Sequence, residues 1–234
     1  MKVLVIGGAG MVGQILQPGL EAEHELFCFD RRSVPALGKR SIVGDLSDQD
    51  AVETAVQDME AVVYLAMGMI GTDRNTCQLV DPAFDVNVRD AYRVMHSALA
   101  AGARRIVYAS SLSVYRSLTS SARFDEQVPA DAWDPYGLSK RVGEMICRAA
   151  AQHFPDATIV ALRMINPCNE ETFAADRGRN GQQTGPNDLR NLYLAALRCD
   201  TPGAHVVQAT GDVADDLLPN HAVNKLLGWR PKGE

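Results

Sequence analysis

The sequence predicts an α/β protein built on a doubly wound parallel sheet. Short, continuously apolar runs alternate along the chain with segments whose apolar residues recur at helical spacing. The links are short, and parallel strands covered by helices on both faces are expected to be apolar throughout. A glycine-rich turn follows the first apolar run directly. Together these observations indicate consecutive strand–helix–strand units in one sheet.

Each element of this sheet can be placed in the sequence. Six apolar runs are expected to form strands: Lys2–Gly7, His24–Asp30, Ser41–Leu46, Ala61–Met67, Arg104–Ser111 and Ala157–Ile165. Four segments between them are expected to form helices: Met11–Leu20, Asp48–Met59, Asp81–Ala101 and Pro135–Phe154. The regular alternation favours a parallel sheet over a meander of hairpins.

The composition changes after Ile165. Residues Asn166–Asp188 are polar and glycine-rich, so one long loop is expected there, and a loop of that length is commonly functional. A helix at Leu189–Arg198, a strand at Ala204–Thr210 and a last short helix follow. We therefore expect a sheet domain over residues 1–165. Residues 166–234 are expected to form a small substrate-binding loop and cap, integrated with the same domain.

Composition and charge exclude several classes of protein. The chain has 234 residues, 46% hydrophobic and 22% charged, which suits one large domain with a packed core. A net charge of −6 argues against nucleic acid or an anionic membrane as a partner. No apolar run reaches the roughly 18 residues of a membrane span, and the strand-like first residues do not resemble a signal peptide.

The cysteines and histidines follow no known ligand or disulfide spacing. The five cysteines are scattered and form no CxxC pair, as expected of reduced thiols in a cytoplasmic protein. The five histidines show no HxxxH or Cys/His spacing. We expect no metal site.

The glycine-rich turn predicts a dinucleotide site. Gly7, Gly10 and Gly13 lie between the first strand and the first helix. The first glycine permits a tight turn, the second a close approach to a pyrophosphate, and the third close packing of helix on strand. The phosphates would then meet free N–H groups at the helix N-terminus. The alternative is a cluster of turn glycines without a ligand.

Acidic residues at the next two strand ends would recognise the adenosine. Asp30 ends the second strand, where a carboxylate can accept hydrogen bonds from ribose hydroxyls. It would repel a 2′-phosphate and so favours NAD over NADP, although Arg31 and Arg32 could partly offset this. Asp45 is placed to meet the adenine amino group, or alternatively to cap the helix that begins near Asp48.

The segment "YGLSK", residues 136–140, places a phenol and an ammonium one helical turn apart. The alternative to a functional pair is a lysine stem packed on a ring with its tip in water. A free tyrosine has a pKa of about 10, and lowering it by two to three units needs roughly 3–4 kcal/mol of preferential phenolate stabilisation. Lys140 and a positively charged nicotinamide can supply this in a partly dry site. Tyr136 would then act as acid and base.

Taken together, these segments resemble the extended short-chain dehydrogenase/reductase family, in its NAD-dependent epimerase/dehydratase group. The resemblance covers Met1 to about Ile165, in the family's order. It rests on GGAGMVG at 7–13, Asp30, GDL at 44–46, YLAMG at 64–68, Asn87, YASSLSVY at 108–115 and YGLSK at 136–140.

The resemblance implies a Rossmann-type fold and a set of site residues. Tyr136 matches the catalytic tyrosine, Lys140 the lysine that binds the nicotinamide ribose, and Ser111 the serine that completes the triad. Ser110 and Ser113 are neighbouring alternatives to Ser111. The implied cofactor contacts are Gly7, Gly10, Met11, Val12, Gly13, Asp30, Arg31, Asp45, Leu46, Leu65, Ala66, Met67, Asn87, Tyr136 and Lys140. For Met67, simple filling of the core is an alternative.

The length and the closing "LLGWRPKGE" are similar to the short uronate dehydrogenase branch, which oxidises a free sugar acid with NAD⁺. We expect Ser111, Asn166 and Arg177 to contact the substrate, with Arg177 pairing a carboxylate. Arg179 is its alternative, and both arginines could instead be merely solvated. The chain departs from the family after the sixth strand, where "INPCNEE" replaces a YGP segment. It also has Leu112 and Ser113 where that branch has a polar pair.

We therefore predict an NAD-dependent oxidoreductase that acts on a CH–OH group of a sugar or sugar acid. Its partner is a sugar-like small molecule, and a homodimer through the two long helices is a family expectation. One alternative is a nucleotide-sugar epimerase or dehydratase, which a larger C-terminal domain would favour. Another is a dinucleotide-sensing regulator without turnover, although such relatives typically lack the Tyr/Lys pair.

Overall fold

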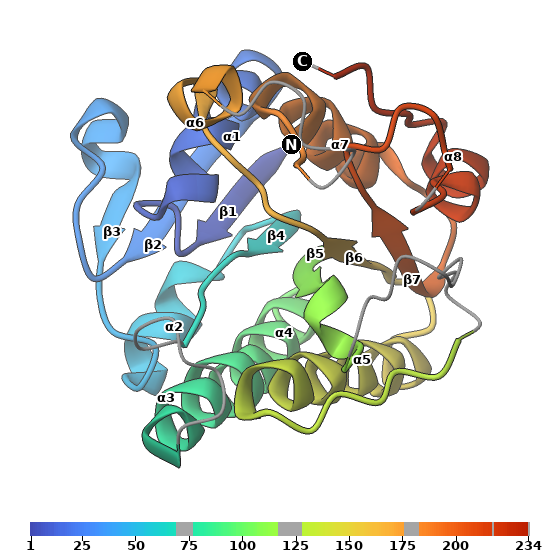
Figure 1. The fold of residues 1–234 in the computed structure, drawn as a ribbon. Helices are drawn as coiled ribbons and strands as arrows, with labels where there is room; N and C mark the ends of the chain where they lie inside the picture. The colour runs from blue at the N-terminus through green and yellow to red at the C-terminus, as the bar shows by residue number, and fades with distance from the viewer. Residues whose placement is uncertain (69–76, 117–127, 176–182, 217, 234) are drawn as a thin grey trace.

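The computed structural model describes residues 1–68, 77–116, 128–175, 183–216 and 218–233. Within them lies one seven-stranded sheet in which every pair of neighbours is parallel, in the order β3-β2-β1-β4-β5-β6-β7 (Figure 1). The strands are β1 (Lys2–Ile6), β2 (Glu25–Asp30), β3 (Ser41–Val43), β4 (Ala61–Tyr64), β5 (Arg105–Ser111), β6 (Thr158–Met164) and β7 (Gly203–Ala209). The predicted doubly wound sheet is confirmed.

Helices cover both faces of the sheet. One face carries α1 (Met11–Glu23), α6 (Glu170–Ala175), α7 (Pro186–Arg198) and α8 (His221–Leu227) (Figure 1). The other carries α2 (Gln49–Ala55), α3 (Val80–Phe84), α4 (Ala91–Ala100) and α5 (Pro135–His153). Each layer has its own apolar core, and the strands contribute alternate side chains to the two. This explains why the strand sequences are apolar throughout.

The helix predicted over Asp81–Ala101 is interrupted. Between α3 and α4 lies a π-helical segment, η3 (Asp85–Asp90). The Tyr64 hydroxyl donates a hydrogen bond to the Val86 carbonyl at 2.5 Å, so a tertiary contact occupies this carbonyl. A π-helical turn also changes which side chains face the sheet. Asn87 and Asp90 are buried as a result.

Residues 166–188 do not form one long loop. They include α6, a parallel bridge between Pro167 and Thr184, and the first turn of α7, which begins at Pro186. Pro186 suits the first helical position because its missing N–H would be unpaired there anyway. Residues 176–182 lie outside the described part of the chain.

The C-terminal residues are part of the same sheet. β7 pairs with β6 over its whole length, from Thr158↔Gly203 to Met164↔Ala209. The tail is fastened by Asp188 of α7, a buried carboxylate that accepts hydrogen bonds from the backbone N–H groups of Lys232 (2.8 Å) and Gly233 (2.9 Å). The remaining short helices are η1 (Pro35–Arg40), η2 (Cys77–Leu79) and η4 (Leu112–Val114).

None of the helices in the described part of the chain combines the length and apolar character needed to cross a membrane.

Candidate functional site

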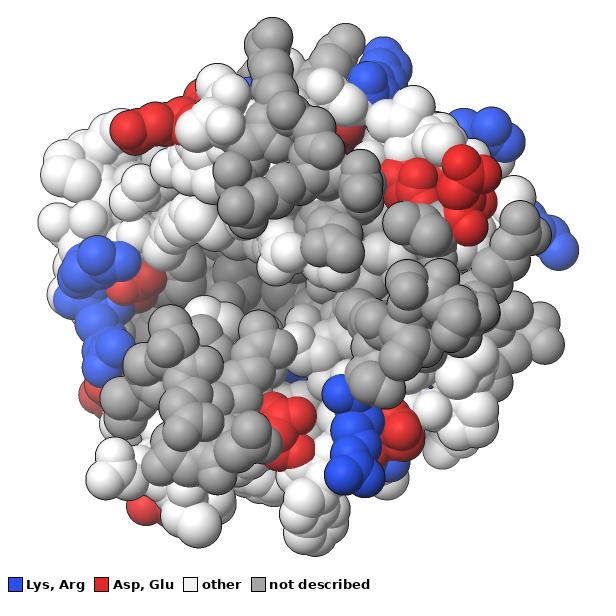
Figure 2. All heavy atoms as spheres, in the orientation of Figure 1, with Lys and Arg blue, Asp and Glu red and all other residues white. Residues whose placement is uncertain are grey.

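A cleft of about 1310 Å³ runs along the carboxyl ends of the central strands. Parallel sheets bind ligands at this edge, near the point where the strand order reverses, which here lies between β1 and β4. We call its two ends the β2–β3 end, lined by Asp30, Arg31 and Asp45, and the β5–β6 end, lined by Ser111, Tyr136 and Lys140. Figure 2 shows the surface hollowed on this face, with basic side chains gathered on the side where β2 and β3 lie in Figure 1.

The turn after β1 is built from glycine for two reasons that the structure makes visible. Gly7 has a φ of +83°, and a Cβ there would lie 2.7 Å from the Ala66 backbone nitrogen. At Gly13 a Cβ would overlap the backbone of Gly8, so only glycine lets α1 pack this closely. A side chain at Gly7 would displace the segment after β4, and one at Gly13 would displace α1.

The N-terminus of α1 is suited to a pyrophosphate. Its N-cap is Gly10, without a side-chain capping bond, and its first turn contains no acidic residue. The backbone N–H groups and the helix dipole therefore favour an anion at this point. Gly10, Met11, Val12 and Gly13 all line the cleft.

Asp30 is held in place by backbone groups on both sides. One carboxylate oxygen accepts from the Ala9 N–H (3.0 Å) and the other from the Arg32 N–H (3.0 Å). The Arg32 guanidinium donates to the Ala9 carbonyl at 2.7 Å, which ties it to the glycine turn. A carboxylate has about four acceptor sites, so Asp30 retains capacity for ribose hydroxyls.

Asp45 does not cap α2. That cap is Asp48, whose side chain accepts from the Ala51 N–H at 3.1 Å. Asp45 instead accepts from the backbone N–H (2.9 Å) and the hydroxyl (2.8 Å) of Ser47, and these hydrogen bonds lower the pKa of its carboxyl. It is exposed and lines the β2–β3 end of the cleft.

Asn87 is the one predicted cofactor contact that does not line the cleft. It is fully buried, and its side chain accepts from the Gly68 N–H (3.1 Å) and donates to the Ser139 hydroxyl (3.0 Å). Ser139 in turn donates to the Tyr136 carbonyl at 2.8 Å. Asn87 thus connects the segment after β4 with the first turn of α5, behind the cleft wall.

The first turn of α5 presents Tyr136 and Lys140 to the cleft. Asp134 caps the helix through the Gly137 N–H (2.9 Å), and Pro135 occupies the first turn. A Cβ on Gly137 would overlap the Ser113 carbonyl, so glycine here lets α5 approach the segment after β5. This explains the residue types in "DPYGLSK" on local grounds.

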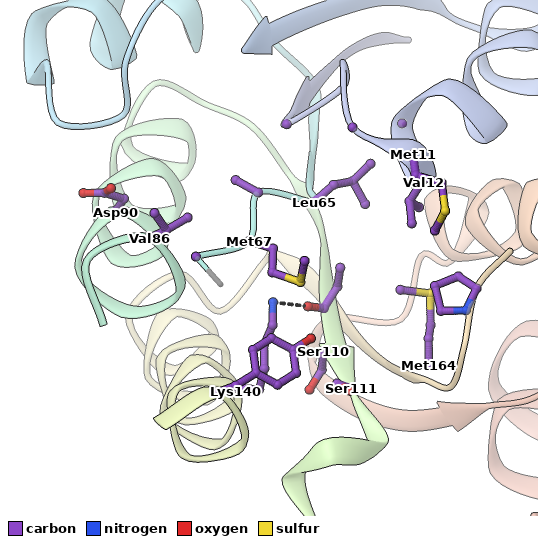
Figure 3. Close-up of a pocket in the computed structure, with 18 of the residues that line it drawn as sticks. Met11, Val12, Leu65, Met67, Val86, Asp90, Ser110, Ser111, Lys140 and Met164 are labelled. Atoms are coloured by element: carbon purple, nitrogen blue, oxygen red, sulfur yellow. Dashed lines mark hydrogen bonds between the residues drawn. The ribbon is translucent and has the colours of Figure 1, made fainter. Parts of the chain in front are cut away.

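Lys140 is buried at the β5–β6 end. Its Nζ donates to the Ala109 carbonyl at 2.8 Å and lies 5.9 Å from the centre of the Tyr136 ring (Figure 3). Only 2% of the lysine and 8% of the tyrosine is exposed. Burial lowers the pKa of Lys140 to about 7, because desolvation disfavours its charged form. The packing interpretation with a solvated lysine tip is therefore wrong for this side chain.

Ser110 and Ser111 end β5 and Ser113 follows in η4, and the surroundings of these three serines differ. Ser110 is buried, and its hydroxyl donates to Glu144 at 2.7 Å. Ser111 is half-buried; its Oγ lies 3.0 Å from the Ser113 Oγ and accepts from the Ser113 N–H at 3.0 Å. All three line the cleft. Ser111 and Ser113 therefore form one hydroxyl pair, and the Ser110 hydroxyl is used elsewhere.

The walls beyond Ser111 are largely apolar. Leu112, Met164 and Ile165 line this end, and they follow or end β5 and β6. Figure 3 shows Met164 at the cleft. Asn166 also lines it, is exposed, and has a φ of +40°, in the left-handed region that non-glycine residues seldom occupy. Arg177 and Arg179 lie outside the described residues.

Sequence reasoning missed several residues of the cleft. Tyr115, Met164 and Ile165 had a usable signal, since they follow the carboxyl ends of strands where such sheets bind ligands. Val86 and Asp90 had none, because the π-helical turn that places them could not be read from helical periodicity. Arg163, a charged residue within an apolar strand, also indicated a buried ion pair, since a buried cation needs a carboxylate partner.

Neither a metal site nor a disulfide is seen in what the structure describes. Among residues 1–68, 77–116, 128–175, 183–216 and 218–233, no group of three or more His, Cys, Asp or Glu side chains could hold a metal ion. All five cysteines are free thiols. Burial raises the pKa of Cys28 to about 11, so this thiol stays protonated beneath the glycine turn.

Comparison with known proteins agrees with this geometry. A model of the "NAD dependent epimerase/dehydratase family" matches residues 3–183. The 2-alkyl-3-oxoalkanoate reductase of Stenotrophomonas maltophilia is 33% identical over 211 residues, which cover 83% of this chain and 62% of the reductase. The chain thus spans less than two thirds of that relative. The L-arabinose 1-dehydrogenase (NAD(P)(+)) of Haloferax volcanii is 31% identical over 224 residues, 89% of this chain and 83% of the dehydrogenase.

Solved structures share the fold over nearly the whole chain. The uronate dehydrogenase of Agrobacterium tumefaciens is 26% identical with a TM-score of 0.80, covering 99% of this chain and 84% of that one. A mutant of that enzyme, solved in complex with NAD, is 25% identical and also gives a TM-score of 0.80, with the same coverage. The glycine turn, the uncapped start of α1 and the oriented Asp30 fit the same cofactor here.

The matched family model, the shared fold and a cleft built for a dinucleotide lead to one conclusion: this chain belongs to the NAD-dependent epimerase/dehydratase family of enzymes, the extended short-chain dehydrogenases and reductases, whose cofactor is NAD.

Proposed function

We propose that this chain is an NAD-dependent oxidoreductase that acts on a CH–OH group of a sugar or sugar acid. The observation that carries the proposal is the arrangement at the β5–β6 end of the cleft. There Tyr136 and Lys140, from one turn of α5, line the same cleft as the half-buried Ser111 at the end of β5. A general base, its tuning cation and a hydroxyl for the substrate oxygen are the groups that alcohol oxidation needs.

When bound, the nicotinamide accepts or supplies the hydride. Tyr136, as phenolate, takes the proton from the substrate hydroxyl during oxidation and returns it during reduction. Ser111 donates a hydrogen bond to the same substrate oxygen and holds it near the phenol. Asn87 supports this arrangement from behind, through Ser139 and the Tyr136 carbonyl.

Lys140 makes the site responsive to pH near neutrality. Its pKa of about 7 means that both of its charge states are populated in the unliganded protein. A phenolate at Tyr136 favours the protonated lysine, and the protonated lysine favours the phenolate, so the two groups titrate as a coupled pair. The only hydrogen bond that fixes the Nζ among the described residues is that to the Ala109 carbonyl, which leaves donors for the ribose.

The substrate class is supported by relatives, and it implies a role for a residue outside the described part. The relatives include an L-arabinose 1-dehydrogenase and uronate dehydrogenases, which by their names act on a sugar and on sugar acids. A sugar acid needs a cation, and Lys140 is committed to the phenol and the ribose. We assign that role to Arg177, with Arg179 as its alternative.

A second candidate function is favoured by the apolar walls of the β5–β6 end. Leu112, Met164 and Ile165 would suit a hydrocarbon substituent better than a polyol. The relative from Stenotrophomonas is by name a reductase of 2-alkyl-3-oxoalkanoates. Reduction of an oxo acid with an alkyl chain would use the same Tyr136, Lys140 and Ser111 in the opposite direction.

The deciding experiment measures the gain or loss of NADH absorbance with purified protein. Neutral sugars and sugar acids are offered with NAD⁺, alkyl-substituted 3-oxo acids with NADH, and nucleotide sugars are tested separately for epimerisation. We expect turnover of a sugar or sugar acid that disappears in Tyr136→Phe. Turnover of oxo acids alone would favour the second function. Epimerisation without net NADH formation would favour a nucleotide-sugar epimerase, and turnover in Tyr136→Phe would refute the assigned base.

A further inference from the structure

A buried ion pair lies directly behind the β5–β6 end of the cleft. Arg163 of β6 donates from Nε and Nη2 to the two carboxylate oxygens of Glu144 in α5, at 2.8 Å each. Arg163 is 3% exposed and Glu144 2%. Two parallel charge-assisted hydrogen bonds fix both the distance and the orientation of the two side chains.

Both members of the pair also contact residues that line the cleft. The Ser110 hydroxyl donates to Glu144 Oε1 at 2.7 Å, and Arg163 Nη1 donates to the Tyr115 hydroxyl at 2.5 Å. Ser110 and Tyr115 lie on either side of Ser111 and Ser113 in the sequence, and both line the cleft. The four side chains therefore connect α5, β5, β6 and the segment after η4 in one buried network.

Lys140 attaches α5 to β5, and Glu144 makes a second attachment one helical turn later. Lys140 Nζ is held by the Ala109 carbonyl and Glu144 by the Ser110 hydroxyl, so successive turns of α5 attach to successive residues of β5. Residues four apart lie on one face of a helix, which places Tyr136, Lys140 and Glu144 along the same side. The Glu144 contact therefore holds the same side of α5 that carries Tyr136 and Lys140.

We propose that Glu144 and Arg163 are positioning residues that set the distance between the Tyr136–Lys140 pair and Ser111. A buried ion pair is weak evidence for a purely stabilising role, because an apolar pair of similar volume commonly stabilises a protein as well. Catalysis, in contrast, depends on sub-ångström placement of the acid/base against the substrate oxygen. The inference rests on the proposed function and deepens it.

Two sets of variants test the proposal. Glu144→Gln and Arg163→Lys keep the approximate volume but break the bidentate pair. Ser110→Ala and Tyr115→Phe each remove a single hydroxyl, so they remain informative if the first set folds poorly. The matched control is Asp188→Asn, a buried carboxylate that holds the C-terminal tail through Lys232 and Gly233 and does not line the cleft.

With the substrate found in the screen, we measure kcat, KM, the Kd of NAD and the Tm for each variant. Glu144→Gln and Arg163→Lys are expected to lower kcat at least about ten-fold while the Kd of NAD stays within about three-fold. The double variant should lose little more than either single variant, because both break the same contact. Asp188→Asn should lower Tm and leave kcat unchanged. A kcat within about two-fold of wild type in the folded variants would overturn the proposal.

If wild type turns over no offered substrate, the proposed function fails but the positioning role is still measured. The readout is then the ultraviolet titration of the Tyr136 phenolate, taken as the difference between each protein and its Tyr136→Phe counterpart. Two groups beside this phenol affect its titration. Lys140 Nζ lies 5.9 Å from the centre of the Tyr136 ring, and Tyr108 interacts electrostatically with Tyr136. Breaking the Glu144–Arg163 pair should shift the midpoint by at least about half a pH unit in one direction or the other, because the placement of Lys140 and Tyr108 beside the phenol changes. An unchanged midpoint in both variants would overturn the proposal.

Discussion

At the β2–β3 end of the cleft Arg31 and Asp45 are exposed and Asp30 is half-buried, whereas at the β5–β6 end Lys140 is almost completely shielded from water. At the first end, hydrogen bonds from Ser47 lower the pKa of the Asp45 carboxyl. Burial at the second end lowers the pKa of Lys140 to about 7.

This difference in exposure suits the two ends to different tasks, the β2–β3 end to recognition of the cofactor and the β5–β6 end to proton transfer. An exposed, permanently charged group can select one cofactor over another, but water screens it and it cannot strongly change the acidity of a neighbour. A desolvated group near its own pKa can exchange protons and shift its neighbour's pKa, at a cost in folding stability. Substitutions at the two ends should therefore change different measured quantities.

The largest effect is expected from Tyr136→Phe. The ring and its packing survive, and only the proton acceptor is lost. General acid–base groups contribute about 10²- to 10⁴-fold to rate, so turnover should fall by at least that lower figure. The Kd of NAD should stay within a few-fold. Retention of more than about a tenth of wild-type kcat would show that Tyr136 is not the acid/base.

Lys140→Met should lower kcat by about 10- to 100-fold and weaken NAD binding as well, because the proposed function has the lysine bind the ribose and stabilise the phenolate. In the oxidation direction, the limb on which the rate rises with pH should move to higher pH, since without the cation the Tyr136 phenol loses its proton less readily. A residual activity with an unshifted profile would contradict the tuning role.

Arg177→Ala tests the sugar-acid assignment. A shielded guanidinium–carboxylate pair is worth very roughly 1.5–3 kcal/mol, so KM for an acid substrate should rise about ten-fold or more. A neutral sugar should be little affected. Arg179→Ala is the matched control. The idea fails if both variants handle acid and neutral sugars in the wild-type ratio, or if no sugar acid is oxidised.

Asp30→Ser probes the β2–β3 end by itself. The unmodified chain should prefer NAD⁺ to NADP⁺ in kcat/KM, and the substitution should narrow or reverse that preference several-fold while kcat with NAD⁺ changes little. Arg31 remains near to pair with a 2′-phosphate, whereas Arg32 is tied to the Ala9 carbonyl. An NADP⁺ preference in the unmodified chain would refute the assignment.

The smallest effect concerns stability. The pKa of Lys140 is about 7 in the folded chain and about 10.4 unfolded, so between these values the unfolded chain binds more protons. The free energy of unfolding should therefore rise from about pH 7 to pH 10 by on the order of 1–3 kcal/mol relative to Lys140→Met. Urea titrations of both proteins at several pH values measure this difference. Parallel curves would mean that Lys140 is not desolvated.

Much of the fold and the cofactor end could be predicted from local sequence. The glycine turn, Asp30 and the cap at Asp134 are determined by a few adjacent residues, and the alternation of apolar runs indicates a parallel sheet without any knowledge of contacts. The prediction was wrong where tertiary contacts intervened. A hydrogen bond from Tyr64 accompanies the π-helical turn at Asn87, and the segment expected as one loop contains α6.

The sequence by itself determined that a glycine turn suited to a dinucleotide lies at the carboxyl ends of parallel strands and that a tyrosine and a lysine share one helix face there, because both depend on backbone periodicity and glycine geometry over a few residues. Only the tertiary structure decided that Lys140 is shielded from water, that the Ser110 hydroxyl donates to Glu144, and that Glu144 is paired with Arg163. Desolvation and ion pairing arise between residues far apart in the chain, as with Lys140 and Ala109. The periodicity of the sequence does not indicate which distant residue will lie beside a charged group.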